Sequence, residues 1–277
     1  MKVQYSTNPE QYARMTTDEL RDTYLIDELF KTDEVNLNYY FVDRTIVGSA
    51  VPENDTLKLT APQKLLAADY FTQRREIGVF NIGGDGVITV DGTNYEMSKL
   101  DILYIGRGNE NIEFKNSGSG ESPRFYFVSY TAHTDHPTTK GTRDEANLVE
   151  LGTDEGASTR NLYQYIHPDG IQSCQLDMGY TQVESGSVWN TMPAHTHLRR
   201  SEVYMYFDLE GDNVVFHLMG PEDETRTIVM RDGEAVFSPP WSFHGGAGTS
   251  NYAFVWAMGG ENQSFDDMDP VEFSDMK

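Results

Sequence analysis

Short β-rich segments separated by turn residues run along most of this chain and restrict what it can fold into. Residues 41–47, 86–90, 102–105 and 124–128 are rich in Val, Ile, Tyr and Phe and are bounded by Gly, Asn or Asp. Asp91-Gly92, directly after the second segment, is a strong signal for a hairpin turn. No long helical pattern separates the segments, so the sequence predicts an all-β fold of antiparallel sandwiches or barrels.

The first forty or so residues contain the clearest helical pattern. Thr17-Asp18-Glu19-Leu20 has the form of a capped helix start. Leu20, Tyr24, Leu25 and Leu29 recur at helical spacing. We therefore predict a short N-terminal helical segment before the strands begin.

The second half of the chain repeats the plan of the first. Arg74-Arg75-Glu76 precedes a strand-like segment at 77–82, as Arg199-Arg200-Ser201-Glu202 precedes one at 203–207. Residues 100–105 match 233–238, and equal counts from Asp101 and Glu234 reach Asn111 and His244. A polar stretch from about 131 to 160 lies between the two copies and is predicted to hold the linker. The repeat predicts two β-domains, at residues 1–150 and 151–277.

His195-Thr196-His197 is the clearest candidate for metal binding. Side chains alternate along a strand, so the two imidazoles point to the same side and can bind one ion together. Glu202 is an odd number of residues from both, so residues 198–201 must turn or bulge to bring its carboxylate round. His244, from a distant predicted strand, would complete the set. Three imidazoles and a carboxylate suit Zn²⁺, Fe²⁺, Mn²⁺ or Ni²⁺ better than Ca²⁺ or Mg²⁺.

The predicted metal site belongs to the second half, because the first half has no histidine before His133. Glu76 and Asn111, at the corresponding places, would be relics of an ancestral site or interface residues. The alternative interpretation of the motif is two surface histidines beside an unrelated acid.

Charge and composition exclude several classes of partner. The chain has 21 Lys and Arg against 44 Asp and Glu, a formal net charge of −23. This charge repels phosphate backbones and anionic membrane surfaces, so we expect no nucleic-acid or membrane partner. No apolar run is long enough for a membrane span or a secretory signal, which predicts a cytoplasmic protein. The single cysteine, Cys174, excludes an internal disulfide and a multi-thiolate zinc site, and we expect it to be a buried small residue.

Three long runs, at residues 74–84, 189–200 and 260–269, resemble the 5-keto-4-deoxyuronate isomerase family over nearly the whole chain. The resemblance implies a bicupin, with two cupin-like antiparallel β-barrels in one chain. It implies interconversion of 5-dehydro-4-deoxy-D-glucuronate and 3-deoxy-D-glycero-2,5-hexodiulosonate in the breakdown of pectin and other uronate polymers. It also implies a cytoplasmic hexamer and a catalytic zinc ion held by His195, His197, Glu202 and His244. Trp189 and Leu209 depart from the general cupin pattern, which has glycine at these places.

The predicted reaction needs the substrate carboxylate to be held and developing charge to be stabilised. A shift between aldehyde and ketone, by an enediol or by hydride transfer, places negative charge on oxygen, which a divalent ion stabilises. Arg199 and Arg200, beside the ligands, are predicted to bind the carboxylate bidentately. Arg160 is a further substrate-binding candidate, and Lys64 a weaker one. The alternative is that these arginines pair with surface acids.

The general acid or base stays open at the level of sequence. His167, Tyr204 and Tyr206 are candidates. His217, in a β-rich segment, is predicted to be a core residue, and His133 and His136 are predicted to be solvent or interface residues. The tryptophans are predicted to serve core packing or a sugar-stacking wall: Trp189, Trp241 and Trp256.

Other functions fit part of the pattern. A 5-deoxyglucuronate isomerase of inositol breakdown would have the same reaction class. A non-catalytic sugar-binding or sensory bicupin would keep the metal site, but a regulator should add a DNA-binding helix pair and a basic face, which this acidic chain lacks. A dioxygenase would use the same ligands with iron instead of zinc.

Overall fold

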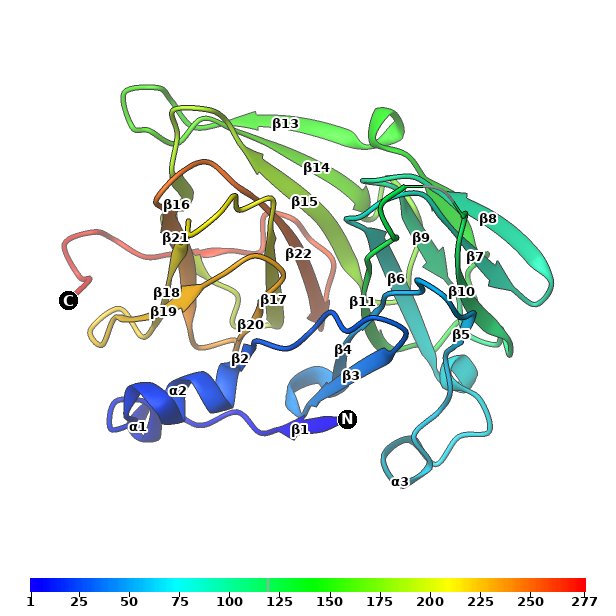
Figure 1. Ribbon diagram of the computed structural model, residues 1–277. Helices are drawn as coiled ribbons and strands as arrows, with labels where there is room; N and C mark the ends of the chain where they lie inside the picture. The colour runs from blue at the N-terminus through cyan, green and yellow to red at the C-terminus, as the bar shows by residue number, and fades with distance from the viewer. Residues whose placement is uncertain (119) are drawn as a thin grey trace.

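A computed structural model describes residues 1–118 and 120–277, and nearly all of its regular structure is β (Figure 1). The helices are short: α1 (Pro9–Tyr12), α2 (Thr17–Tyr24) and α3 (Gln63–Leu66), with 3-10 turns η1 (Val42–Arg44), η2 (Phe71–Gln73) and η3 (Arg143–Glu145). None of the described helices is long and apolar enough to cross a membrane. The prediction of an all-β fold with a short N-terminal helical segment is confirmed.

The first part of the chain forms a sandwich of two sheets. Its strands are β1 (Lys2–Gln4), β3 (Val35–Tyr40), β4 (Thr45–Ala50), β5 (Leu57–Lys58), β6 (Arg75–Asn81), β7 (Gly86–Val90), β8 (Thr93–Met97), β9 (Ile102–Ile105), β10 (Ile112–Asn116), β11 (Phe125–Thr131) and β12 (Thr139–Gly141). The larger sheet has the order β1-β3-β4-β11-β6-β9-β12 and the smaller one β5-β10-β7-β8. The predicted hairpin joins β7 to β8, with Val90 paired to Thr93.

The second part repeats this arrangement. Its strands are β2 (Leu25–Ile26), β13 (Asn147–Leu151), β14 (Arg160–Ile166), β15 (Asp177–Val183), β16 (Trp189–Thr196), β17 (Arg200–Phe207), β18 (Val215–Gly220), β19 (Arg226–Met230), β20 (Ala235–Ser238), β21 (Phe243–Gly248), β22 (Ala253–Gly260) and β23 (Asp269–Pro270). The sheet orders are β13-β14-β15-β22-β17-β20-β2 and β19-β18-β21-β16-β23. In each part the two sheets face each other as a jelly-roll sandwich and do not close into one barrel, which corrects the barrel detail of the prediction.

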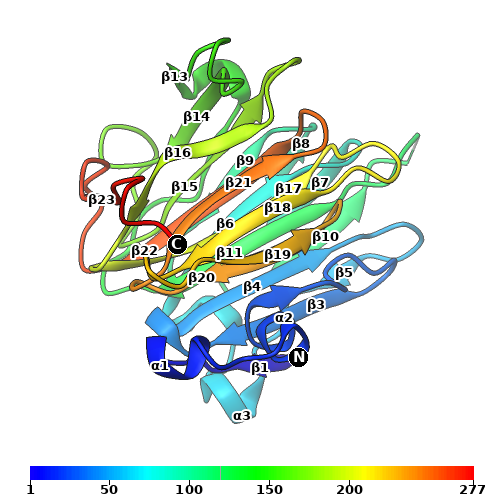
Figure 2. The same cartoon turned by 90° about the vertical axis from the view of Figure 1, so that its left-hand side faces the viewer.

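The two seven-stranded sheets pack against each other in the middle of the molecule (Figures 1 and 2). Phe80 on β6 lies 5.5 Å from Tyr180 on β15, measured between ring centroids, and all seven residues of β6 are buried. Alternate β6 side chains therefore enter two different cores: Ile77 and Val79 fill the first sandwich, and Phe80 joins the core shared with the second. Burial on both faces explains why residues 77–80 in the middle of β6 form a continuous apolar run.

The N-terminal segment belongs to the second sandwich in space. α2 begins at a capping box formed by Thr16 and Glu19, one residue before the capped start predicted at Thr17, and it ends at Tyr24. Leu25 and Ile26 form β2 and pair with β20, so the helical spacing that continued to Leu29 does not continue as helix. The reason is that pairing to an exposed sheet edge satisfies the backbone there and buries Leu25 and Leu29.

The polar stretch from 131 to 160 is not a structureless linker. β12 pairs with β9 of the first sandwich, and β13 pairs with β14 of the second. Both are edge strands. The side chains of β13 are exposed or half-buried, and β12 is half-buried apart from Gly141, so neither strand has the apolar pattern of a buried strand. The chain changes sandwich between β12 and β13.

Two acidic residues of the first sandwich bind backbone of the second. Glu76, fully buried, accepts hydrogen bonds from the backbone N–H groups of Cys174, Gln175 and Leu176 at 2.6, 2.9 and 3.0 Å. Asp43 Oδ2 accepts one from Ser201 N at 3.1 Å. Glu76 is thus an interface residue, one of the two roles predicted for it. Cys174 is half-buried, and its Sγ accepts a hydrogen bond from His133 N at 3.0 Å, so it is not the fully buried apolar residue we expected.

Strand register shows which residues of the two sandwiches correspond. Glu202 pairs with Ser238, and in the first sandwich Ile77 pairs with Ile105 at the matching place. His244 pairs with Met219, and Ile112 pairs with Val90. Ile77 and Ile112 therefore stand where the second sandwich has Glu202 and His244. The predicted counterparts, Glu76 and Asn111, are each off by one residue. Glu76 is off because the ladders align Arg75 with Arg200, so Ile77 and not Glu76 matches Glu202. Asn111 is off because the stretch from Ile105 to Ile112 is one residue longer than the stretch from Ser238 to His244.

Candidate metal centre

The structure brings the four predicted ligands together inside the second sandwich. His195 on β16 pairs directly with His244 on β21, and Glu202 enters from β17 on the facing sheet. A turn in which Arg200 N donates to His197 O at 3.0 Å reverses the chain between His197 and Glu202, as the spacing predicts. Ligand atoms of the three imidazoles lie within 4.8 Å of one another. Glu202 Oε2 lies 2.8 Å from His244 Nε2 and 3.3 Å from His197 Nε2.

The chemistry of this cluster fits a divalent cation. Glu202 Oε2 and His244 Nε2 are buried, and neither has a partner in hydrogen-bond geometry among the described residues. Burial raises the pKa of Glu202, but His244 and His197 outweigh this and lower its pKa overall. Burial, with the neighbouring imidazoles, lowers the pKa of His195 to about 3. A charged carboxylate and a neutral imidazole are the protonation states that metal ligation requires.

Further contacts fix the orientation of the imidazoles. His197 Nδ1 donates to the carbonyl oxygen of Asp267 at 2.9 Å, which leaves Nε2 free for a metal. His244 Nδ1 lies 3.2 Å from Ser238 Oγ, which directs its Nε2 toward Glu202 in the same way. Hydrogen bonds of this kind set the tautomer of a ligating histidine and raise its affinity for metal.

A cavity of about 240 Å³ leads to the cluster. His195, His197 and Glu202 line its inner end, and apolar residues such as Phe254, Met258 and Phe265 form much of the wall. Arg160 is the one Lys or Arg among the described lining residues. Its Nη1 donates to Ser158 O at 2.9 Å, and it forms no ion pair with a described acidic side chain. The guanidinium can therefore bind an anion that enters the cavity.

Three other polar groups face this cavity. Thr181 Oγ1 and Trp256 Nε1 are buried without a hydrogen-bond partner among the described residues, and both residues line the cavity. Tyr204 OH lies 3.0 Å from Thr191 Oγ1. Burial raises the pKa of Tyr204 well above its ordinary value, so the phenol keeps its proton and serves as a donor. Unpaired buried polar groups are costly unless a ligand or water meets them, so Thr181 and Trp256 can hydrogen-bond a molecule in the cavity.

The structure does not bring Arg199 and Arg200 to the cavity wall. Arg199 donates to Asp267 Oδ1 at 2.7 Å and to Asp269 Oδ2 at 2.8 Å. Arg200, only 1% exposed, donates to Asp177 Oδ2 at 3.3 Å and to the Asp267 carbonyl at 3.0 Å. Both guanidinium groups are thus paired within the chain and secure the segment that orients His197. Lys64 lies on α3 of the first sandwich, away from the cavity.

Some of the remaining candidates for proton transfer and stacking line the cavity, and the others do not. Tyr204 and Trp256 line the cavity, whereas Tyr206 lies deeper and contacts buried His217 at 2.8 Å. His133 and His136 are exposed and half-exposed, respectively. Trp241 donates to the Thr7 carbonyl in the N-terminal segment and Trp189 is half-buried, and neither lines the cavity.

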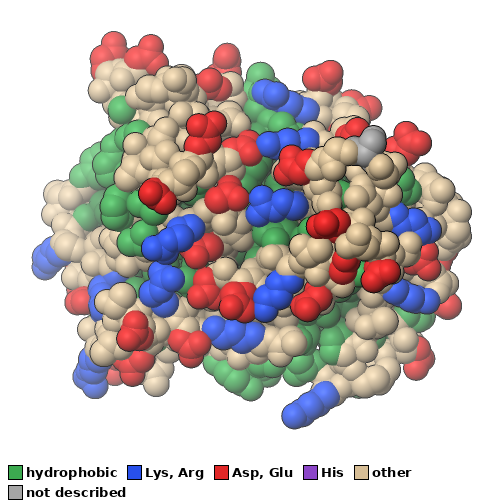
Figure 3. Space-filling model, viewed as in Figure 1, with side chains coloured by type: hydrophobic (Ala, Val, Ile, Leu, Met, Phe, Trp, Pro, Cys, Tyr) green, Lys and Arg blue, Asp and Glu red, His purple; other side chains and the backbone are tan. Residues whose placement is uncertain are grey.

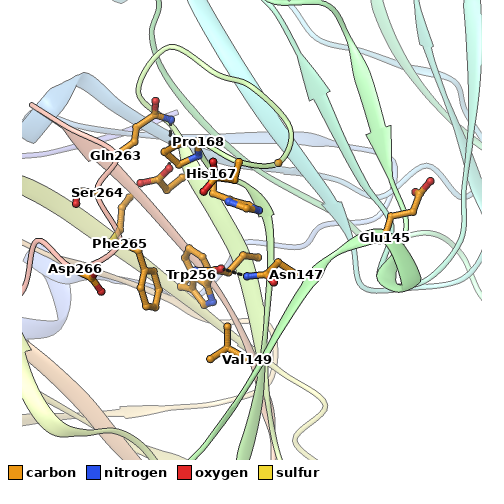
Figure 4. Close-up of a pocket in the computed structure, with 15 residues that line it drawn as sticks. Glu145, Asn147, Val149, His167, Pro168, Trp256, Gln263, Ser264, Phe265 and Asp266 are labelled. Atoms are coloured by element: carbon orange, nitrogen blue, oxygen red, sulfur yellow. Dashed lines mark hydrogen bonds between the residues drawn. The ribbon is translucent and has the colours of Figure 1, made fainter.

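A second, larger hollow of about 750 Å³ adjoins the metal cavity (Figure 4). The two share Trp256, Met258 and Phe265, and His167 and Asp177 face the larger one. Burial raises the pKa of Asp177 to about 7, although Arg200 opposes this. Thr181, Asp177 and residues of the segment 263–268 line these two cavities and were not predicted as site residues. The acidic run at 266–269 was a visible signal, but nothing in it indicated that its backbone reaches His197.

Comparison with known proteins shows the family of the chain. A family model described as the KduI/IolB family matches residues 25–275. The chain belongs to the KduI/IolB family. Relatives at this level include proteins named 4-deoxy-L-threo-5-hexosulose-uronate ketol-isomerase from Lachnoclostridium phytofermentans, at 50% identity, and from Bacillus subtilis, at 48% identity. Each alignment spans 277 residues and 100% of both chains.

Solved structures show that the KduI/IolB chain has a cupin-like fold. An IolB-like protein from Salmonella typhimurium matches with a TM-score of 0.66 at 11% identity, covering 82% of this chain and 87% of that one. An oxalate decarboxylase from Lactobacillus farciminis matches with a TM-score of 0.56 at 11% identity, covering 79% and 78%. The predicted bicupin architecture and the prediction of an isomerase are confirmed.

Proposed function

We propose that this chain is a metal-dependent ketol-isomerase that interconverts 5-dehydro-4-deoxy-D-glucuronate and 3-deoxy-D-glycero-2,5-hexodiulosonate in the breakdown of pectin and related uronate polymers. The observation that carries the proposal is the meeting, in one cavity, of a His and Glu cluster with a single arginine. The cluster suits a divalent ion, and the arginine suits the carboxylate of a sugar acid. Relatives that align over the full length of the chain at 48% and 50% identity are named for this reaction.

We assign the metal to His195, His197, Glu202 and His244, which also makes them the catalytic residues. Zn²⁺ is our preferred ion because it accepts this mixture of nitrogen and oxygen ligands, with Fe²⁺, Mn²⁺ and Ni²⁺ as alternatives. When bound, such an ion stabilises negative charge on the substrate oxygens as the carbonyl group changes position. One carboxylate among neutral ligands leaves the centre net positive, which attracts an anionic substrate despite the chain's net charge of −23.

The residues of the cavity have distinct roles in this proposal. Arg160 takes over the carboxylate clamp first assigned to Arg199 and Arg200, since those two are paired elsewhere. A guanidinium binds a carboxylate through two parallel hydrogen bonds and so fixes the end of the chain that does not react. Thr181 Oγ1 and Trp256 Nε1 bind substrate hydroxyl groups, and Tyr204 donates to the oxygen that gains charge. The apolar wall with Phe254 and Phe265 excludes water and strengthens these contacts.

A 5-deoxyglucuronate isomerase is the second candidate, and the structural likeness to an IolB-like protein favours it. That likeness is at 11% identity, whereas relatives named for the first reaction reach 50%. Both substrates are sugar acids of similar size and would use the same clamp.

Product identification separates these candidates. Purified protein is incubated in separate reactions with 5-dehydro-4-deoxy-D-glucuronate and with 5-deoxy-D-glucuronate, and products are followed by NMR and chromatography. We expect conversion of the first to the 2,5-diketo acid, loss of that activity in His195→Ala, and full activity in His133→Ala, an exposed control. Preference for the second substrate would transfer the assignment to the inositol pathway, and turnover of neither would overturn both.

We further propose the organisation of the working enzyme. Residues 1–150 form most of a metal-free domain and 151–277 most of the metal-binding domain. The change of sheet between β12 and β13 supports a boundary near this place, with β13 (Asn147–Leu151) and the N-terminal β2 joining the second sandwich. The protein works in the cytoplasm as a homohexamer, as the family resemblance implies. Sedimentation velocity on the purified protein tests the hexamer.

A further inference from the structure

A cavity of about 500 Å³ in the first sandwich is surrounded by arginines. We call it the arginine pocket and define it by Arg44, Arg74, Arg75, Arg107 and His133, with an apolar wall of Leu65, Leu66 and Phe71. No acidic residue is among its lining residues in the described part of the chain. The chain as a whole is negatively charged, with a net charge of −23, but this pocket is positively charged. Its arginines repel one another unless an anion lies between them. None of its residues lines the metal cavity.

Arg75 is the most informative member of the pocket, because it is only 4% exposed. Its Nε donates to Ser129 Oγ at 3.0 Å, and its Nη2 donates to the carbonyl oxygens of Ser129 and Arg44. These partners are all neutral, and within residues 1–118 and 120–277 Arg75 forms no ion pair with an acid. Burial lowers its pKa to about 10, so it stays charged at neutral pH. A buried charge without a counter-ion is costly, and proteins normally pair such charges.

The internal repeat shows what Arg75 lacks. Arg75 pairs with Thr131 on β11, as Arg200 pairs with Gly260 on β22, so the two arginines occupy corresponding places. Arg200 has a carboxylate partner in Asp177, which pairs with Met258. The residue that corresponds to Asp177 in the first sandwich is Ile46, which pairs with Ser129. The first sandwich keeps the buried cation and lacks the internal counter-ion.

The other arginines of the pocket are also largely free of acids. Arg44 is exposed and forms no side-chain hydrogen bond with the described residues. Arg74 donates to the carbonyl oxygens of Leu66 and Ala67, which ties the α3 wall to the pocket. Arg107 alone has a carboxylate partner, Asp135 at 2.9 Å, and that side chain is 72% exposed. At least three guanidinium groups thus remain without an acidic partner around one cavity.

We propose that the arginine pocket binds a small organic anion that carries a carboxylate or a phosphate group. Guanidinium groups bind both through paired charge-assisted hydrogen bonds. A volume of about 500 Å³ is within the range of small-molecule sites and holds a molecule of sugar-acid or sugar-phosphate size. The leucines and Phe71 contact the carbon part of the ligand. The site is separate from the proposed isomerase centre and does not depend on that assignment.

Calorimetric titration of the full chain tests the proposal. D-Glucuronate and inorganic phosphate are the two probes, with KCl holding the ionic strength constant. All proteins carry His195→Ala and Arg160→Gln, so that neither the metal centre nor the proposed carboxylate clamp contributes. We expect saturable binding of one anion per chain, and the probe that binds more tightly tells whether a carboxylate or a phosphate is preferred. Loss of one guanidinium should weaken binding about tenfold or more, so we expect this in Arg44→Gln and in Arg107→Gln.

Arg14→Gln is the matched control, because Arg14 is an exposed arginine outside the pocket. These variants leave buried Arg75 in place, and thermal unfolding without anion checks that each is folded. Binding that is equal in the pocket variants and in the control would overturn the proposal. So would the absence of saturable binding with either probe. A third outcome would also overturn the proposal. If the protein without a pocket substitution binds no anion and Arg44→Gln changes subunit association, the pocket is a contact between chains.

Discussion

Glu202 Oε2 lies 2.8 Å from Nε2 of His244, although β17 and β21 belong to opposite sheets of the second sandwich. The carboxylate therefore links the two layers at the place where His195 and His197 also converge. Because the sheets have their own apolar cores, an ion at this point joins elements that are already folded. The proposed metal centre would thus be built on a stable frame, and we expect loss of the ion to affect activity much more than folding.

Arg160→Lys tests the carboxylate clamp. The substitution keeps the charge but removes the planar fork, so we expect kcat/KM for the uronate to fall about tenfold or more, roughly 1.4 kcal/mol. Steady-state kinetics on the uronate and on a neutral analogue without the carboxylate measure the effect. The neutral analogue should lose little further in the variant. Arg124→Lys, at a half-exposed ion pair with Asp232 outside the cavity, is the control and should behave as the wild type. Equal losses for both substrates in Arg160→Lys would mean that Arg160 does not bind the carboxylate.

Glu76→Ala tests the attachment of the two sandwiches. The substitution leaves three backbone N–H groups, those of Cys174, Gln175 and Leu176, without their acceptor. We expect the free energy of unfolding to fall by about 3 kcal/mol or more, measured by urea denaturation. Glu113→Ala, which breaks an exposed pair with Lys115, should change the free energy of unfolding by less than about 1 kcal/mol.

Metal content should be unchanged in Glu76→Gln, since Ile77 and not Glu76 occupies the place that corresponds to Glu202. Loss of metal in Glu76→Gln would contradict that register.

Asp177→Asn tests the buried carboxyl beside Arg200. Burial raises the pKa of Asp177 to about 7, whereas an unfolded chain has an Asp pKa of about 3.9. Between these values the folded protein holds a proton that the unfolded chain has released, so this group lowers stability as pH rises from about 4 to about 7. Thermal unfolding at pH 5 and pH 8 should therefore show a larger loss in the wild type than in Asp177→Asn. An identical loss in both proteins would show that Asp177 is already ionised at the lower pH.

The grouping of His195, His197 and Glu202 could be predicted from sequence because it depends on local rules, and their role as metal ligands stays a proposal. Alternation along β16 places His195 and His197 on one side, and the odd spacing to Glu202 requires the turn that the structure contains. The all-β fold followed from short apolar segments with turn residues between them. The role of Arg199 and Arg200 could not be predicted in the same way. Their partners, Asp267, Asp269 and Asp177, come from distant parts of the chain, and proximity to the ligands in sequence said nothing about those contacts.

Strand register and the pairing of edge strands were the other features that could not be predicted from the sequence. A shift of one residue in a strand turns every side chain to the opposite face, so a counting error of one exchanged Ile77 for Glu76 and Ile112 for Asn111. β2 was read as part of a helix because its pairing partner, β20, lies far along the chain. The arginine pocket was invisible for a related reason: Arg75 was seen as part of a motif, but its lack of a counter-ion depends on Ile46 in another strand.

The metal content of the purified protein tests the central claim most directly. Elemental analysis should find about one divalent ion per chain in the wild type and almost none in His244→Ala, while circular dichroism and the unfolding transition show that the variant stays folded. His133→Ala, at an exposed histidine outside the cavity, should keep the full content. A wild-type value near two, or a His244→Ala protein that retains its ion, would contradict a single metal centre held by His195, His197, Glu202 and His244.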